Sequence, residues 1–195
     1  MSTAQISAGL YVSGPGILYA APLLTAEPLS TVVASTFAST LWPAAWAPVG
    51  STSDGFTFKD TITTAPVVAA ESYYPVKVIT TARSAQLDVI LQEFHAGNLK
   101  LALNTTTALV TGSTATMLTQ ISPPVVGSEV RSMWGWQSQD DTVRLIAYQA
   151  LQTGPLSVKF SKGAVPAQLT MQLDLELPAT GGAYVIYLAG AARGA

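Results

Sequence analysis

The chain of 195 residues contains no cysteine, which excludes disulfide bonds, thiolate chemistry and a disulfide-stabilised secreted scaffold. Charged residues are scarce as well, because they make up 10% of the sequence whereas 49% of it is hydrophobic. A typical globular protein has about 25% charged residues. A soluble monomer with so few charges would expose large apolar areas, which usually mark contact surfaces or membranes. The composition therefore indicates either self-assembly or a lipid environment.

Long apolar runs and clusters of basic residues are also missing. No stretch approaches the ~20 apolar residues that a membrane-spanning helix needs. The nine Lys and Arg residues are scattered along the chain, and the net charge is −2. Proteins that hold nucleic acid tightly use clustered cations to replace the counterions of the phosphates. The sequence therefore argues against tight binding of DNA or RNA.

A membrane-spanning β-barrel is the harder alternative to exclude. Residues 168–177 alternate strictly between polar and apolar side chains, which is typical of a lipid-facing strand. Residues 1–8, however, contain no Lys or Arg, and the Gly-Pro-Gly at residues 14–16 interrupts the first apolar stretch. Because a signal peptide has a basic start and an uninterrupted apolar centre, we expect no export signal and no membrane partner.

The sequence also lacks a recognisable catalytic device. Its single histidine, His95, has neither a cysteine nor a second histidine with which to share a zinc ion, and no G-x-S-x-G motif occurs. Asp174 and Glu176 share one face of an expected strand, but two side chains about 7 Å apart form at most half of a calcium site. We therefore expect no enzyme, no metal site and no cofactor, and a structural or helix-capping role for His95.

The clearest structural pattern lies in residues 73–104. Two runs of alternating apolar and polar residues predict two strands, joined by a turn near Ser84 and Ala85, because successive side chains of a strand point to opposite faces. A short helix follows, with Asn98 as its expected N-cap. The unit is therefore expected to be a hairpin that leads into a helix lying across a sheet.

The remaining chain alternates between short strands and turns. Residues 42–50 place two tryptophans among prolines and a glycine, which predicts a packed connection. Residues 63–72 have no clear period and predict a long loop, whereas the continuously apolar residues 183–189 predict a strand covered on both faces. Residues 29–41 are expected to be a loop with at most one helical turn. Further strands are expected at residues 10–21, 56–62, 109–121, 142–151, 156–160 and 168–177.

Together these elements predict a mainly β protein with one short flanking α-helix. About seven to nine strands and a single helix favour a β-sandwich or a partly rolled barrel. We expect one domain over residues 1–195, which is long enough to bury roughly 70% of the surface that its extended chain would expose.

The order of several short motifs resembles a known family. These motifs are GILYAAP at residues 16–22, AWAPVGSTSDG at 45–55, AESYYPV at 70–76 and GSEVR at 127–131, followed by the closing alternating strand. In this order and spacing, which cover nearly the whole chain, the sequence resembles the major tail tube proteins of long-tailed, siphovirus-type bacteriophages. No single motif is a catalytic fingerprint.

The resemblance implies a structural virion protein that is made in the cytoplasm of the bacterial host. Subunits of this family assemble into hexameric rings, their inner sheets join into a continuous barrel, and the rings stack into a tube through which the genome passes. An extended loop and the chain ends contact the next ring. The implied partners are other copies of the chain and the tape-measure, tail-tip and terminator proteins, with DNA passing through without tight binding.

Two surfaces are candidates for these tasks. The polar face of one or both of the alternating strands at residues 86–94 and 168–177 is expected to line the channel, because it is neutral to acidic while the opposite face is apolar. The candidate residues are Gln86, Asp88, Gln92, Gln168, Thr170, Gln172, Asp174 and Glu176. A loop arm at about residues 58–74 is expected to join neighbouring rings, since long loops in compact domains usually have a function; its residues include Lys59, Asp60, Pro66, Glu71, Tyr73 and Tyr74.

Two other classes of protein remain open on the residues alone. A phage capsid or decoration subunit would share the same logic of assembly. A β-sandwich carbohydrate-binding or adhesin module would share the strands, and its tryptophans would stack on sugars, although packing at chain corners explains those tryptophans equally well.

Overall fold

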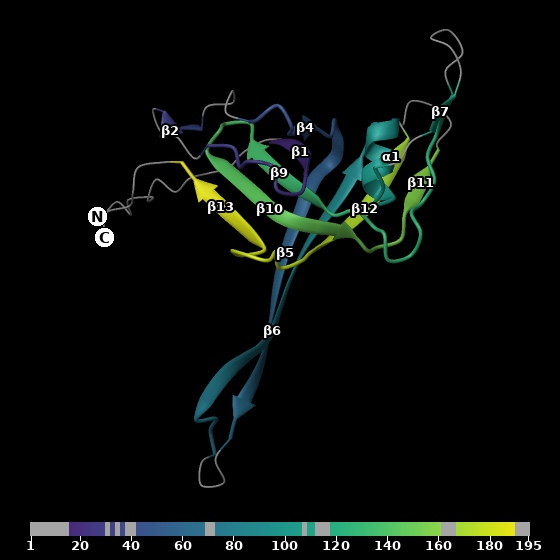
Figure 1. Cartoon of the computed structure of the whole chain (residues 1–195). Helices are drawn as coiled ribbons and strands as arrows, with labels where there is room; N and C mark the ends of the chain where they lie inside the picture. Colours follow the sequence, from purple (N-terminus) through teal and green to yellow (C-terminus); the bar gives the residue numbers. More distant parts are fainter. Residues whose placement is uncertain are drawn as a thin grey trace.

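The computed structural model describes residues 16–29, 32–33, 36–37, 42–68, 73–106, 109–111, 118–160 and 167–189. Within these residues the protein is mainly β with one short helix, as predicted (Figure 1). Nine strands form one open antiparallel sheet in the order β4-β1-β9-β10-β12-β6-β5, with β11 beside β12 and β13 beside β10. Its strands are β1 (Gly16–Pro22), β4 (Ala47–Pro48), β5 (Thr52–Val67), β6 (Lys77–Leu91), β9 (Ser132–Ser138), β10 (Val143–Gln152), β11 (Ser157–Lys159), β12 (Gln168–Leu175) and β13 (Tyr184–Leu188).

Three small elements accompany the sheet. The helix α1 spans Ala96–Ala102, and β7 (Leu109–Thr111) pairs with β8 (Leu118–Gln120), so residues 109–121, expected to form a strand or a hairpin, contain a pair of short strands. β2 (Val32–Val33) pairs with β3 (Thr36–Phe37). The predicted loop at residues 29–41 therefore contains a short strand pair, and the rest of that stretch lies outside the described residues, as do residues 10–15 of the first expected strand.

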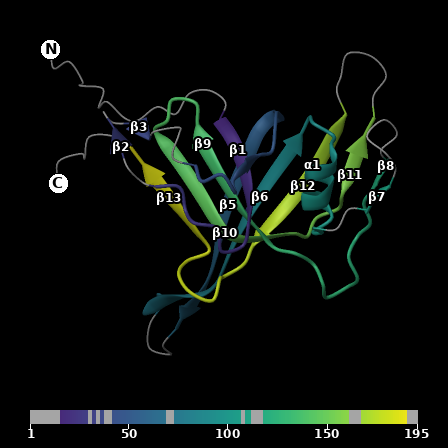
Figure 2. The ribbon, with the colours of Figure 1, turned by 45° about the horizontal axis from the view of Figure 1, so that its top comes forward.

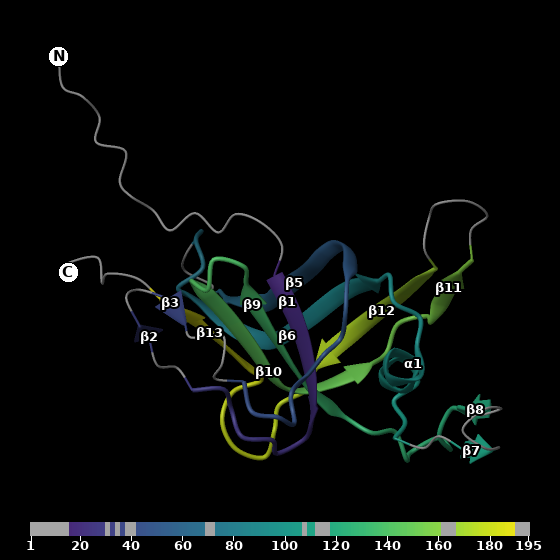
Figure 3. The same cartoon turned by 90° about the horizontal axis from the view of Figure 1, so that it is seen from above.

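The sheet is strongly curved, so that its two halves enclose the main core (Figure 2, Figure 3). Buried residues of β1 and β9 form one hydrophobic cluster with buried residues of β6 and β12. The rings of Phe56 from β5 and Trp136 from β9 lie 5.1 Å apart across this core. This open, curved sheet is consistent with the predicted β-sandwich or partly rolled barrel.

A second cluster of apolar residues is built around residues 42–50. Trp42 stacks on Tyr19 with ring centroids 4.1 Å apart and meets Trp46 edge-on at 5.0 Å. Trp46 is buried against Met133 and Ile146. The prediction that this stretch is a packed connection is confirmed.

A buried arginine ties this second cluster to the sheet. The guanidinium of Arg144 donates two hydrogen bonds to Oε1 of Gln137, at 3.0 and 2.6 Å, and one to the carbonyl of Leu29 at 2.6 Å. It also lies 5.2 Å from the centre of a Trp42 ring. Burial lowers the pKa of Arg144, but hydrogen bonds and an aromatic face compensate for much of the lost hydration.

The predicted turn near Ser84 and Ala85 is wrong, because β6 is one continuous strand. Ser84 and Ala85 lie opposite Thr61 and Asp60 of β5 in an antiparallel ladder. Their small side chains resemble a turn in the sequence, but the partner strand keeps the backbone extended through them. The hairpin of this region is therefore formed by β5 and β6.

The N-cap of α1 lies three residues before Asn98, the residue expected to be the cap. His95 is the N-cap, and its Nδ1 accepts a hydrogen bond of 3.0 Å from the amide of Gly97, which confirms a capping role for this histidine. The prediction of Asn98 as the cap is wrong. Asn98 lies inside the first turn, where its side-chain amide donates to the carbonyls of Val49 at 2.9 Å and Glu93 at 2.8 Å.

The prediction that residues 183–189 form a strand covered on both faces is also wrong for the isolated chain. β13 pairs with β10 in the described part of the sheet and forms an edge. Ile186 and Leu188 are 44% and 68% exposed. A continuously apolar run indicates burial of both faces, yet these two side chains remain exposed in the part of the chain that the structure describes.

We expect Asn98→Ala to lower the free energy of unfolding by roughly 1–3 kcal/mol, because the buried carbonyl of Val49 and the partly buried carbonyl of Glu93 lose their donor. Thermal or urea unfolding of the purified chain measures this loss. His95→Ala is the matched control, since it removes only the exposed cap and should cost about 0.5–2 kcal/mol. A loss for Asn98→Ala smaller than that for His95→Ala would contradict the assigned roles.

Candidate functional site

The two polar stripes predicted in separate parts of the sequence form one surface. β12 and β6 are adjacent and antiparallel, with Gln172 opposite Asp88 and Asp174 opposite Gln86. The residues between them in each strand, such as Leu87 and Met171, point into the core. Because opposite partners share a face of the sheet, this register joins both stripes into a polar face that we define by Thr57, Lys59, Gln86, Asp88, Thr170, Gln172 and Asp174.

The charges on this polar face are paired. Lys59 of β5 forms an ion pair with Asp88 of β6, and the side-chain amide of Gln86 donates to the same carboxylate. Partial burial opposes ionisation of Asp88, but the hydrogen bonds from Lys59 and Gln86 outweigh it, so the pKa of Asp88 lies below its usual value. Lys59, expected in the inter-ring arm, therefore belongs to the polar face.

Asp174 belongs to this polar face, and Gln168 and Gln92 extend it along β12 and β6. Asp174 accepts a hydrogen bond of 2.7 Å from the hydroxyl of Thr153. Gln168 lies opposite Lys159 of β11, and Gln92 follows the last residue of β6. Each of these positions continues the polar stripe of its own strand, as the alternation predicted.

Glu176 has a structural partner instead. It follows the end of β12, and its carboxylate accepts hydrogen bonds from Arg131 Nε at 2.9 Å and from the side-chain amide of Gln149 at 2.6 Å. The pKa of Glu176 lies below its usual value, mainly because Arg131 donates this hydrogen bond to the carboxylate. No group of three His, Cys, Asp or Glu residues that could hold a metal ion occurs in the described part of the chain.

The predicted loop arm is a β-hairpin. The strands β5 and β6 stay paired from Thr61 and Ser84 as far as Val67 and Lys77, and they project away from the sheet (Figure 1). Pro66 is accommodated because β5 is an edge strand, where a missing backbone N–H is tolerated. The prediction of an irregular loop through residues 63–67 is therefore wrong, and Glu71 lies outside the described residues.

The projecting part of this hairpin, which we call the arm, exposes apolar side chains on both faces. Tyr73 has a relative exposure of 104%, as high as in an extended chain. A two-stranded hairpin alone is marginally stable in water, and exposed apolar surface of this extent marks a contact site. The exposed large apolar residues of the arm are Ile62, Val67, Val68, Tyr73, Tyr74, Val76, Val78 and Ile79.

A polar cluster fixes the root of the arm. Arg83 Nε lies 3.0 Å from both carboxylate oxygens of Asp60, and an Nη of Arg83 donates to the hydroxyl of Tyr184 at 2.9 Å. Tyr184, the first residue of β13, also donates to Asp60 and meets the ring of Phe58 edge-on at 4.7 Å. Hydrogen bonds from Arg83 and Tyr184 lower the pKa of Asp60 to about 2.

Sequence reasoning identified Asp60 but missed Arg83 and Tyr184. Arg83 could have been found in the sequence, because it is the one charged residue within residues 78–87 and an isolated charge in such a stretch indicates a specific partner. Tyr184 gave no such signal, because it lies about a hundred positions away and its contact with the arm depends on the course of β13.

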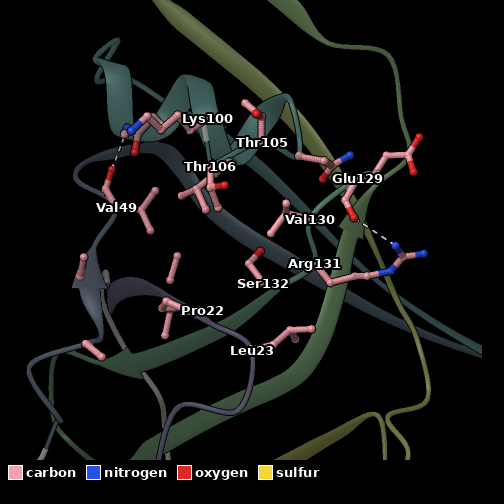
Figure 4. Close-up of a pocket in the computed structure, with 18 of the residues that line it drawn as sticks. Pro22, Leu23, Val49, Lys100, Thr105, Thr106, Glu129, Val130, Arg131 and Ser132 are labelled. Atoms are coloured by element: carbon pink, nitrogen blue, oxygen red, sulfur yellow. Dashed lines mark hydrogen bonds between the residues drawn. The ribbon is translucent and has the colours of Figure 1, made fainter. Parts of the chain in front are cut away.

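An apolar groove lies beside α1 (Figure 4). It has a volume of about 620 Å³. Pro22 and Leu23 form one wall, Leu101 of α1 another, and Val130 a third. Glu129 lies at its margin, where its backbone carbonyl accepts a hydrogen bond from Arg131 at 3.1 Å. No local sequence pattern announces the groove, because four separate segments supply its walls.

Comparison with known families now places the chain. A family model described as phage tail tube protein matches residues 3–161. The chain belongs to the phage tail tube protein family. It is accordingly a structural component of the phage tail, and the family points to a structural rather than a catalytic role. The curated proteins include no match. Among the described residues, no helix has the length and apolar character needed to cross a bilayer.

The cluster at the root of the arm predicts an acid-sensitive joint. The pKa of Asp60 is about 2 in the folded chain and about 3.9 for an unstructured aspartate. Because the folded pKa is the lower one, the stabilising contribution of Asp60 is complete above the unfolded pKa and is lost as the pH falls through the folded pKa. We therefore expect the protection of backbone amides at the root of the arm, measured as their exchange rate relative to that of an unstructured chain at the same pH, to fall between about pH 4 and 2.

Tyr184→Phe tests the cause of this shift. The substitution removes one donor to Asp60 and keeps the ring against Phe58, so the Asp60 pKa should rise toward its usual value. A titration of the carboxyl carbon by NMR measures it, with Tyr187→Phe as the control in the same strand. An unchanged Asp60 pKa in Tyr184→Phe would show that Tyr184 does not contribute.

Proposed function

We propose that copies of this chain assemble into hexameric rings that stack into the tail tube, and that the tube channel carries the phage genome during delivery. The observation that supports this proposal most is the polar face, because one register unites neutral and acidic side chains from three neighbouring strands. Family membership supports the assignment to the tail tube, and it favours this function over a capsid subunit or a sugar-binding module.

In this proposal the polar face lines the channel. Its one cation, Lys59, is held by Asp88, so the surface offers DNA amides, hydroxyls and carboxylates. A surface without clustered cations releases no counterions from the phosphates and does not retain the duplex. The DNA would therefore slide past the face rather than bind to it.

Open sheet edges supply the contacts within a ring. β5 ends one side of the sheet, and the short β4 ends the other. Unpaired edges are templates for further strands, and identical subunits arranged around a rotation axis close such contacts into a ring. Joining the sheets of neighbours would continue the polar face around the channel.

The arm is proposed to reach the next ring, because it projects beyond the body and carries little charge. Asp60 lies at its root, whereas Pro66, Tyr73 and Tyr74 lie in its projecting part. At the ends of the tube, the tape-measure, tail-tip and terminator proteins would bind the same surfaces that otherwise contact another ring. The subunit would be made in the host cytoplasm and end in the virion.

Electron microscopy of the purified, concentrated chain tests the assembly. We expect rings or hollow tubes for the natural sequence. A variant in which an Asn-Gly turn replaces residues 63–82 joins Ile62 directly to Arg83, which lie opposite each other, and preserves the root of the arm. It should remain folded and form no tubes. Tubes of normal length from this variant would show that the arm does not stack rings.

Cations placed on the polar face test the channel. Gln86→Lys combined with Gln172→Lys adds two cations to the polar face, so that with Lys59 its cations outnumber the carboxylates of Asp88 and Asp174, and DNA ejection should slow by about tenfold or more while the tubes stay intact. Raising the salt concentration should restore the rate, because it weakens the attraction to phosphate. The charge-matched control is Ala179→Lys with Thr180→Lys in an exposed loop. Unchanged ejection and infectivity would exclude this face as the channel lining.

A further inference from the structure

We propose that the loop between β12 and β13 is a recognition site for a cysteine transpeptidase of the sortase type, which would join this subunit covalently to an amine. The loop reads Leu-Pro-Ala-Thr-Gly-Gly at residues 177–182. Enzymes of this class recognise Leu-Pro-x-Thr-Gly, where x is variable, and cleave the bond between the threonine and the glycine. The loop matches every defined position of this motif. The proposal concerns a modification of the single subunit and does not depend on how the subunits assemble.

The motif lies at the surface of the protein. The side chain of Leu177 is 73% exposed, and Ala179, Thr180 and the two glycines are exposed as well, whereas Pro178 is half-buried. Figure 2 shows the loop standing away from the sheet, between the end of β12 and the start of β13. Exposed loops of small and polar residues are the preferred sites at which enzymes cut a folded chain. The motif therefore lies where a transpeptidase can reach it.

The backbone of the motif is not part of the sheet. At one end of the loop the amide of Glu176 donates to the carbonyl of Gln149 at 2.9 Å. At the other end the amide of Tyr148 donates to the carbonyl of Ala183 at 3.0 Å. Between these two points residues 177–182 form no backbone–backbone hydrogen bond with the described part of the chain. The motif can therefore extend into an active site without breaking the ladders of β12 and β13.

The fold of the single chain explains one of the defined motif residues. Gly181 has a φ of 90°, in the left-handed region where glycine carries no steric penalty, so the turn itself favours a glycine there. Leu177, Pro178 and Thr180 belong to neither of the two apolar clusters of the described residues. Core packing thus does not select these three residues, whereas recognition by a transpeptidase does.

The reaction is an acyl transfer. The thiolate of the enzyme attacks the carbonyl carbon of Thr180, the peptide bond to Gly181 breaks, and the amino group of Gly181 leaves with a proton. The thioester on Thr180 is then attacked by the acceptor, an unhindered primary amine such as the amino-terminal glycine of a cell-wall peptide. This second step forms a new amide bond and returns the thiol to the enzyme. Because the chain itself has no cysteine, the nucleophile belongs to the enzyme.

The cut leaves the contacts on both sides of it in place. It separates residues 181–195, which include β13, from the rest of the chain. β13 remains paired with β10, and Val185 and Tyr187 remain packed against the second apolar cluster. We therefore expect the subunit to keep its fold while Thr180 carries the acceptor.

Labelling with purified sortase A tests the site. The full chain is incubated with the enzyme and with a triglycine peptide that carries a fluorophore, and the products are separated under denaturing conditions and identified by mass spectrometry. We expect a fluorescent adduct of residues 1–180 and a free peptide of residues 181–195. No adduct, under conditions in which a synthetic peptide of residues 175–184 is labelled, would overturn the proposal because the folded chain would then withhold the motif.

Two substitutions separate recognition of the motif from mere exposure of the loop. Leu177→Ala removes the apolar side chain that the enzyme binds, and we expect it to lower the labelling rate by about tenfold or more. Ala179→Ser changes the variable position, which is also exposed, and should leave the rate essentially unchanged. Equal labelling rates for these two variants would overturn the proposal, and so would an adduct formed at any bond other than Thr180–Gly181.

Discussion

The antiparallel pairing of β12 with β6 is the constraint on which the rest of the structure depends. It aligns Leu169 with Leu91 and Leu175 with Ala85, so the apolar residues of both strands enter one core and their polar residues share the opposite face. Successive side chains of a strand point to opposite faces of the sheet. If β12 were shifted by one residue against β6, each face of the sheet would carry the apolar side chains of one strand beside the polar side chains of the other. Burial of the core therefore fixes the register, and the register creates the polar face as a consequence.

The same pairing determines where the arm begins. β12 ends at Leu175, and β13 resumes the pairing with β10 only at Tyr184. β6 thus loses its neighbour at Ala85, and from that point β5 and β6 have only each other. Tyr184 lies at this branch point and binds Asp60 and Arg83, so the strand that starts the next segment of the sheet also fixes the direction of the arm.

A strand could be predicted from the sequence where one of its faces is buried and the other is exposed, because only then do apolar and polar residues alternate. The polar stripes at residues 86–92 and 168–174 were predicted because one face is buried and the other is not. The first strand of the arm, at residues 63–67, was mistaken for a loop because both of its faces are exposed, which removes the alternation, whereas its second strand was predicted from the alternating run that begins near Pro75. Asn98 was mistaken for a cap because buried and capping asparagines are identical in sequence. The groove and the Asp60–Arg83–Tyr184 cluster join distant segments, and no local pattern encodes such contacts.

The few charged residues of the chain lie mainly where different strands or segments are joined. The ion pairs found among the described residues are Lys59–Asp88, Arg83–Asp60 and Arg131–Glu176, and each connects different strands or segments. Exposed pairs of this kind contribute only about 0–1 kcal/mol to stability, so their main effect is to orient the elements that they join. The arm beyond its root and the outer edge of β13 are left almost without charge. Their apolar side chains stay exposed in the single chain, and neighbouring copies would cover them in the proposed assembly. A composition with few charges is thus what a subunit needs if its native environment consists largely of other subunits.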